Sequence, residues 1–170
     1  HRKRFTFAHE IGHAILHSDS SIIKSNVNVT SIFNYSKELD TVEKQANYFA
    51  SELLCPSKFL RREIPNTSLN FEIIDEIAAK FKISRQVAAI KCVSNSKTEN
   101  ELLLFYDNND EFKWFVTNDF DLNYSDFPND LRDLDVFLDQ YFDKKLDIEK
   151  YYVENYGTTI LATGDIAFNL

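Results

Sequence analysis

The sequence His9-Glu10-Ile11-Gly12-His13 decides how this chain is interpreted, because it places two histidines and a carboxylate at helical spacing. On an α-helix, residues four apart lie one turn apart on nearly the same side, so both imidazoles can reach a single ion. Neutral imidazole nitrogens bind zinc at about 2.0–2.1 Å. The motif therefore predicts a zinc site in which His9 and His13 are ligands.

Glu10 lies between the two histidines, and the motif predicts that it is the catalytic carboxylate. Zinc makes a hydroxide nucleophile available near neutral pH, and an adjacent carboxylate can accept the proton that is released. With only 4 histidines in 170 residues, chance would produce this motif in under about one per cent of such chains. The alternative is a solvated helix face with two incidental histidines, which the apolar residues around the motif disfavour.

A catalytic zinc ion usually has three protein ligands and one open position, so a third ligand is needed. The candidates are His17, Glu38, Asp40, Glu43 and Glu52. A second helix is expected over Thr41–Leu54, between a possible N-cap at Asp40 and a stop at Pro56. Glu43 lies on the same stripe of that helix as Ala46 and Ala50, where a cation would relieve the cost of burying a carboxylate. The alternative role for Glu43 is an N-terminal capping box.

The first helix is expected from His9 to about residue 18, with Thr6 as a possible N-cap. Its predicted buried stripe consists of Ala8, Ile11, Ala14 and Ile15, and Gly12 is expected to leave room where this helix meets a neighbour. His17 lies one turn beyond His13. It is open to three interpretations: a substitute ligand, a group that contacts the ligands without binding the ion, or a partly exposed histidine.

The pattern of the whole chain predicts an α+β protein in three parts. Residues 1–66 are expected to form a helical, zincin-like metal-binding core, 67–98 a helix-turn-helix-like pair packed on it, and 99–170 an acidic α/β region. The elements expected beyond the core are helices within 68–94 around Lys82-Ile83-Ser84, a hairpin of 101–107 and 111–117, an acidic helix over 131–141, and strands at 151–156 and 158–161. A loop or short hairpin is expected over 19–37.

The acidic residues are concentrated in the last part of the chain. Residues 1–100 hold 14 Lys and Arg against 11 Asp and Glu, whereas 101–170 hold 5 against 16. An acidic surface repels nucleic-acid phosphates, so this part is expected to be a solvated surface or a docking face for a basic partner. The two cysteines indicate reduced thiols in a cytosolic protein. No apolar window is long enough to predict a membrane span.

Two longer motifs carry a resemblance to a known family. Residues 4–17 (RFTFAHEIGHAILH) and 43–56 (EKQANYFASELLCP) together resemble the ImmA/IrrE family of zinc metallopeptidases. The likeness continues weakly through Phe81-Lys82-Ile83-Ser84, so it covers about residues 1–95. Residues 101–170 match nothing recognisable.

The resemblance implies a set of roles. It implies that His9 and His13 are zinc ligands, that Glu10 is the catalytic carboxylate and that Glu43 is the third ligand. Asn47 of the second motif, together with His17, is a candidate to contact the ligands without binding the ion. Members of this family are cytoplasmic bacterial or phage proteins that cleave a DNA-binding repressor, often one encoded beside them. A protein substrate of that kind is therefore expected here.

The chain also departs from the family. Members carry a strand and a helix before the motif helix, so we expect this chain, which starts at His1, to be truncated at its N-terminus. Cys55 stands where a methionine is common, and a packed thiol is the preferred interpretation.

Two rival functions remain at this stage. In the first, the helix pair makes the protein a transcriptional regulator that binds DNA or protein, with a vestigial or structural metal site. Its possible phosphate contacts are Lys80, Lys82, Arg85 and Lys91, although Glu72, Asp75 and Glu76 on the same element oppose this. In the second, a zinc-bound module recognises a repressor without cutting it.

Overall fold

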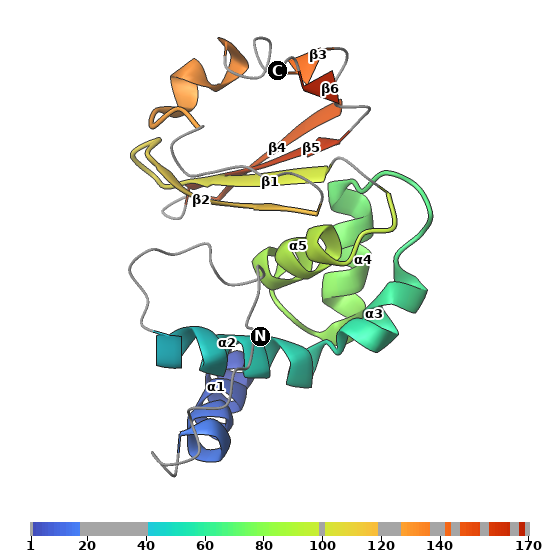
Figure 1. Cartoon of the computed structure of the whole chain (residues 1–170), viewed down its shortest axis with the longest axis vertical. Coiled ribbons are helices and arrows are strands. Elements are labelled where there is room, and N and C mark those ends of the chain that lie inside the picture. The colour runs from blue at the N-terminus through green and yellow to red at the C-terminus, as the bar shows by residue number, and fades with distance from the viewer. Residues whose placement is uncertain are drawn as a thin grey trace.

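The structure is a computed structural model, and the residues that it describes up to residue 98 contain five α-helices. It describes residues 2–17, 41–98, 101–118, 127–136, 142–143, 147–153, 157–163 and 167–168. The helices are α1 (Arg2–Leu16), α2 (Thr41–Leu54), α3 (Ser57–Glu63), α4 (Phe71–Phe81) and α5 (Arg85–Ser94). Figure 1 shows α4 and α5 between the sheet and the α1–α2 pair.

Helix α1 begins earlier than the sequence predicts. It starts at Arg2, and Thr6 is therefore an interior residue whose hydroxyl donates to the Arg2 carbonyl oxygen at 3.1 Å rather than capping the helix. The predicted buried stripe was also partly wrong. Ala8 and Gly12 are buried, but Ala14 is exposed and Ile15 is 61% exposed. The reason is that, among the described residues, α1 packs mainly against α2 through its small residues.

Helix α2 has the predicted bounds, and its alanines allow the close approach expected of them. Ala46 and Ala50 are fully buried. A Cβ added at Gly12 would lie 3.1 Å from the Phe49 ring and 3.2 Å from both the Cα and the carbonyl oxygen of Ala46. The helices are thus nearly in backbone contact where they cross. The proposed N-cap Asp40 lies outside the described residues, as do Glu38 and 19–37.

Replacing Gly12 by alanine is expected to destabilise the protein by about 1–3 kcal/mol, the usual cost of overpacking. Alanine gains about 1 kcal/mol of helix propensity, but the backbone of Ala46 cannot yield unless α1 and α2 separate. Chemical denaturation would measure the loss of unfolding free energy. Ala14→Ser, on the exposed side of α1, is the control and should change little. A more stable Gly12→Ala protein would contradict the close crossing.

The helix pair α4–α5 was predicted correctly, including its turn. Asn70 caps α4 by accepting from the Ile73 amide at 2.8 Å, and Ser84 caps α5 by accepting from the Val87 amide at 3.2 Å. Lys82, which ends α4, is left-handed with φ 54°. Helix α3 was not predicted, because Pro56 was read only as a stop, whereas it also occupies the N-cap position of α3.

The second layer is a four-stranded antiparallel sheet in the order β2-β1-β5-β4. Its strands are β1 (Glu101–Tyr106), β2 (Phe112–Thr117), β4 (Asp147–Val153) and β5 (Gly157–Thr163). The hairpin β1–β2 and the strand expected at 158–161 confirm the sequence predictions. Strand β4 begins four residues before the strand expected at 151–156, and 154–156 lie outside the described residues. A separate pair joins β3 (Phe142–Asp143) to β6 (Ala167–Phe168).

The two central strands of the sheet, β1 and β5, are buried on both faces. Leu103 and Trp114 pack with α3, α4 and α5 in one apolar cluster, whereas Leu102 and Leu104 belong to a second cluster with Leu134. Strand β1 is therefore a continuous apolar run, which is typical of a strand covered on both sides. Of the predicted acidic helix over 131–141, a 3-10 helix η2 (Leu131–Asp133) leads into helical residues 134–136, and the rest lies outside the described residues.

A buried carboxylate joins the sheet to the helices. Glu101 is fully buried, and its Oε1 accepts from the Leu69 amide at 3.0 Å and from the Thr98 hydroxyl at 2.6 Å. Its Oε2 has no hydrogen-bond partner among the residues that the structure describes. Burial raises the pKa of Glu101 above the ordinary value of 4.5, although these hydrogen bonds lower it.

The raised pKa predicts a pH dependence of stability. The folded chain keeps the Glu101 proton to a higher pH than the unfolded chain, so this contribution to stability is complete below pH 4.5 and is lost as the pH rises through the folded pKa. Glu101→Gln should remove that loss, because an amide does not ionise in this pH range. Urea unfolding at several pH values would measure it, with exposed Glu111→Gln as the control. An unchanged pH profile would contradict the prediction.

The mixed helix and sheet content confirms the α+β class. No strand occurs in the described ranges 2–17 and 41–98, so a zincin-like sheet beside the motif helix stays an expectation.

Candidate metal centre

Three side chains from α1 and α2 converge where the two helices cross. The atoms His9 Nε2 and His13 Nε2 are 2.9 Å apart. Glu43 Oε2 lies 3.3 Å from His9 Nε2, and Glu43 Oε1 lies 3.2 Å from His13 Nε2. Each of the three residues offers one ligand atom within 4.8 Å of the others. Helix α1 supplies both histidines from successive turns, and the first turn of α2 supplies the carboxylate.

The geometry and the donor types fit a small divalent ion. Donors held at 2.0–2.1 Å around a tetrahedral ion are about 3.3–3.4 Å apart, close to the separations seen here. Two imidazole nitrogens with one carboxylate oxygen are ligands that zinc prefers, and they leave a fourth position open. The side chains of His9, His13 and Glu43 are 17%, 26% and 43% exposed, so the cluster is accessible from solvent. These residues could hold a catalytic metal.

The ring of His9 is oriented from its far side by Asn47. The contact joins His9 Nδ1 to Asn47 Oδ1 at 3.0 Å. Because a carbonyl oxygen only accepts, His9 Nδ1 carries the hydrogen, and the lone pair of Nε2 faces the cluster. Asn47 follows Glu43 by one helical turn, so one side of α2 supplies both the third donor and this contact. The structure thus places Asn47 where the sequence suggested.

The ring of His13 has a longer set of contacts behind it. Its Nδ1 lies 3.1 Å from His17 Nδ1, and His17 Nε2 lies 3.0 Å from Gln45 Oε1. His17 therefore contacts a candidate ligand from outside and does not join the cluster of donor atoms. Sequence reasoning missed Gln45, which carried no signal of its own.

The two remaining glutamates of the predicted site, Glu10 and Glu52, differ in whether other residues bind their carboxylates. Glu10 is exposed and has no hydrogen-bond or ion-pair partner among the described residues, so its carboxylate is available as a base. Glu52, a rival third ligand, is instead bonded to Lys91 and to Ser57. Burial would raise the pKa of Glu52, but the hydrogen bonds from Lys91 and Ser57 outweigh it and lower that pKa. Glu52 therefore binds Lys91 and Ser57 and is not part of the cluster of candidate ligands.

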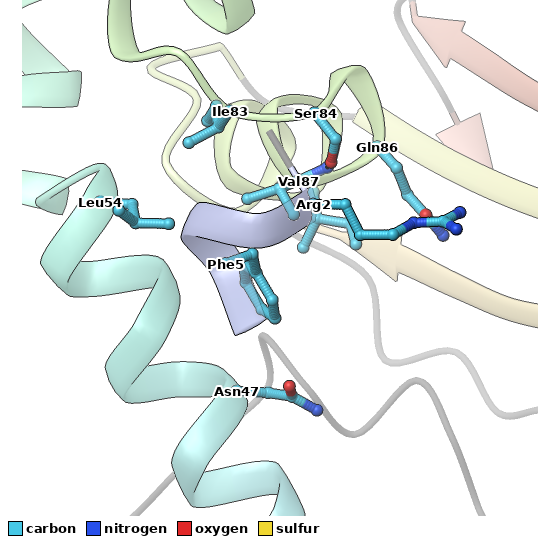
Figure 2. A pocket seen from close by; sticks show the side chains of 9 residues that line it. Arg2, Phe5, Asn47, Leu54, Ile83, Ser84, Gln86 and Val87 are labelled. Carbon is cyan, nitrogen blue, oxygen red and sulfur yellow. The ribbon is translucent and has the colours of Figure 1, made fainter. Parts of the chain in front are cut away.

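A pocket of about 270 Å³ lies beside the cluster, where α1 and α2 approach α5 (Figure 2). Its lining residues are Arg2, Phe5, Asn47, Leu54, Ile83, Ser84, Gln86, Val87 and Ile90. Asn47 connects the two features, because it lines the pocket and also bonds His9. Most of the pocket wall is apolar, and polar groups such as Arg2 and Gln86 lie near its edge in Figure 2. The pocket could accept an apolar side chain.

The fold and the cluster together define an α+β protein with a candidate single-metal centre between its first two helices. Comparison with known proteins assigns the class: residues 1–93 match the Peptidase M78 family, described as the IrrE N-terminal-like domain. The chain belongs to this family, and the resemblance to ImmA/IrrE proteins is confirmed.

One relative is the metallopeptidase ImmA of Bacillus subtilis (strain 168). It is 39% identical over 90 residues, which make up 52% of this chain and 48% of that protein. The chain therefore matches about half the length of this relative. Among the described residues, no helix is both long and apolar enough to cross a membrane.

Proposed function

We propose that this protein is a zinc-dependent endopeptidase that acts in the cytoplasm on a specific protein substrate. The observation that carries the proposal is the convergence of His9, His13 and Glu43 on one point. Glu10 follows His9 in α1, is exposed, and has no hydrogen-bond or ion-pair partner among the described residues. Family membership and the name of the Bacillus relative support a metal-dependent peptidase.

The residues would divide the chemistry between them. His9, His13 and Glu43 would hold the zinc ion, which when bound supplies electrophilic catalysis and water activation. Glu10 would take up a proton as the nucleophile attacks and return it to the leaving amine. Asn47 would keep the His9 ring in place. The adjacent pocket would receive an apolar side chain of the substrate.

The division of the chain belongs to the proposal as well. We propose 1–66 as the catalytic core and 67–98 as a helix pair packed on it, with 99–170 as an acidic region whose partner is unknown. Leu60 and Ile64 of the core share one apolar cluster with Ile74 and Val93, which supports packing of the helix pair on the core.

The rival reading as a DNA-binding regulator is less well supported. Three of the four basic side chains that were candidates for phosphate contacts have acidic partners: Lys80 with Glu63, Arg85 with Asp75 and Lys91 with Glu52. Lys91 is also fully buried. These charges are already neutralised within the fold, which leaves little to attract DNA. A DNA affinity that falls steeply with salt would favour the rival.

The substrate we propose is a DNA-binding repressor encoded beside this protein. The zinc-loaded full chain would be incubated with that repressor, and the products analysed by mass spectrometry. Cleavage at one bond, stopped by EDTA and restored by zinc, is the expected result, with an apolar residue next to the cleaved bond. An intact repressor, with zinc bound, would instead support recognition without cleavage.

A further inference from the structure

Behind His13, three side chains form a continuous relay from α1 to α2, which we call the His13–His17–Gln45 relay. The two links are His13 Nδ1 to His17 Nδ1 at 3.1 Å and His17 Nε2 to Gln45 Oε1 at 3.0 Å. All three residues are half-buried. His17 directly follows α1, and its amide donates to the His13 carbonyl at 2.9 Å, which holds it one turn beyond His13.

With a metal ion on His13 Nε2, the amide oxygen at the end of the relay fits a single arrangement of its hydrogens. Gln45 Oε1 can only accept, so His17 Nε2 carries a hydrogen. A neutral imidazole has one N–H, so His17 Nδ1 is an acceptor and takes its hydrogen bond from His13 Nδ1. His13 Nε2 then has its lone pair available for a metal ion, toward which His9 and Glu43 also offer ligand atoms. Without an ion, the 2.9 Å contact between His13 Nε2 and His9 Nε2 needs a hydrogen on one of the two nitrogens, so this arrangement of hydrogens belongs to the metal-bound protein.

We propose that Gln45, acting through His17, is a positioning residue that holds His13 in its metal-binding tautomer. This inference rests on the proposed function, because it assumes that the cluster holds a metal. It assigns a role to a residue that does not touch the cluster. Hydrogen bonds to the far nitrogen of a ligating histidine orient the ring and strengthen it as a ligand. Asn47 makes such a hydrogen bond to His9 directly. For His13 the partner in that hydrogen bond is His17, which Gln45 holds in turn.

The test measures zinc affinity of the full chain by competition with a chelating dye. Gln45→Met keeps the size of the side chain but removes the acceptor, and it should weaken zinc binding about 10–100-fold. Gln45→Glu keeps an acceptor and should bind zinc at least as well as the wild type. Glu76→Met is the control, since it also replaces a polar side chain by methionine, on the exposed side of α4, and should leave affinity unchanged.

Two further readouts separate positioning from a merely structural link between the helices. His17→Phe should weaken zinc binding as Gln45→Met does, and the double variant should lose no more than either single variant, because both break one relay. In the zinc-loaded protein, correlation spectra of the ring nitrogens should show hydrogen on His13 Nδ1 and on His17 Nε2. In zinc-loaded Gln45→Met, the hydrogen on His17 Nε2 should exchange with solvent faster than in the wild type.

Wild-type affinity in Gln45→Met, additive losses in the double variant, or hydrogen on His17 Nδ1 in the zinc-loaded protein would each overturn the relay. These outcomes are distinct from failure of the proposed function. If the wild-type chain bound no zinc, the proposed function and the relay would both fall, whereas zinc binding that Gln45→Met leaves unchanged would overturn the relay alone.

Discussion

Glu10→Gln is expected to lower the rate of peptide hydrolysis by about 10²–10⁴-fold without loss of bound zinc. Glutamine matches the shape of glutamate but cannot accept the proton. Glu10 is exposed and unpartnered among the described residues, so the change should break no contact in the fold. It also lies outside the cluster of three donor atoms, which is why the metal should remain. Cleavage rates and zinc content of the same preparation provide the measurement.

A matched control for this variant is Glu72→Gln, which makes the same change at an exposed position of α4. It should leave the rate unchanged. Two outcomes would count against the assigned role of Glu10. A rate equal to that of the wild type would mean that another group accepts the proton, and loss of zinc would mean that Glu10 is itself a ligand.

The helices of the candidate site could be predicted because their spacing is a local property. Residues four apart on a helix share a side, so His9 and His13 were placed together without any knowledge of the fold. The bounds of α2 followed from residue 40 and Pro56 in the same way. Glu43 required one further inference, that a carboxylate on an apolar stripe faces another helix, and the structure brings it to the two histidines.

Other features of the molecule depend on tertiary contacts that no local pattern contains. Ile15 matched the helical stripe but is exposed, because small residues set the crossing of α1 and α2 and direct the buried side toward Gly12. Gln45 lies two residues from Glu43, so the two side chains leave different sides of α2. Its role emerges only because His17, from the end of α1, extends far enough to meet it.

Glu43→Gln is expected to abolish most of the stabilisation that zinc gives to this protein. A ligand that binds only the folded state raises the free energy of unfolding by about 4.1 kcal/mol when it is present at 1,000 times its dissociation constant. An amide oxygen is a much poorer zinc ligand than a carboxylate. A 100-fold loss of affinity at the same zinc concentration would therefore remove about 2.7 kcal/mol of that increment. Thermal or urea unfolding in zinc and in EDTA would measure it.

The sharpest comparison for this variant is Glu52→Gln, the same change at the other glutamate of α2. Glu52 is paired with the fully buried Lys91, so Glu52→Gln should lower stability by about 1–3 kcal/mol in zinc and in EDTA alike. Its zinc-dependent increment should equal that of the wild type. The two glutamates thus separate a loss of metal binding from a loss of packing. The assignment would be reversed if the stabilisation by zinc disappeared in Glu52→Gln and persisted in Glu43→Gln. Zinc binding would then depend on Glu52 and not on Glu43.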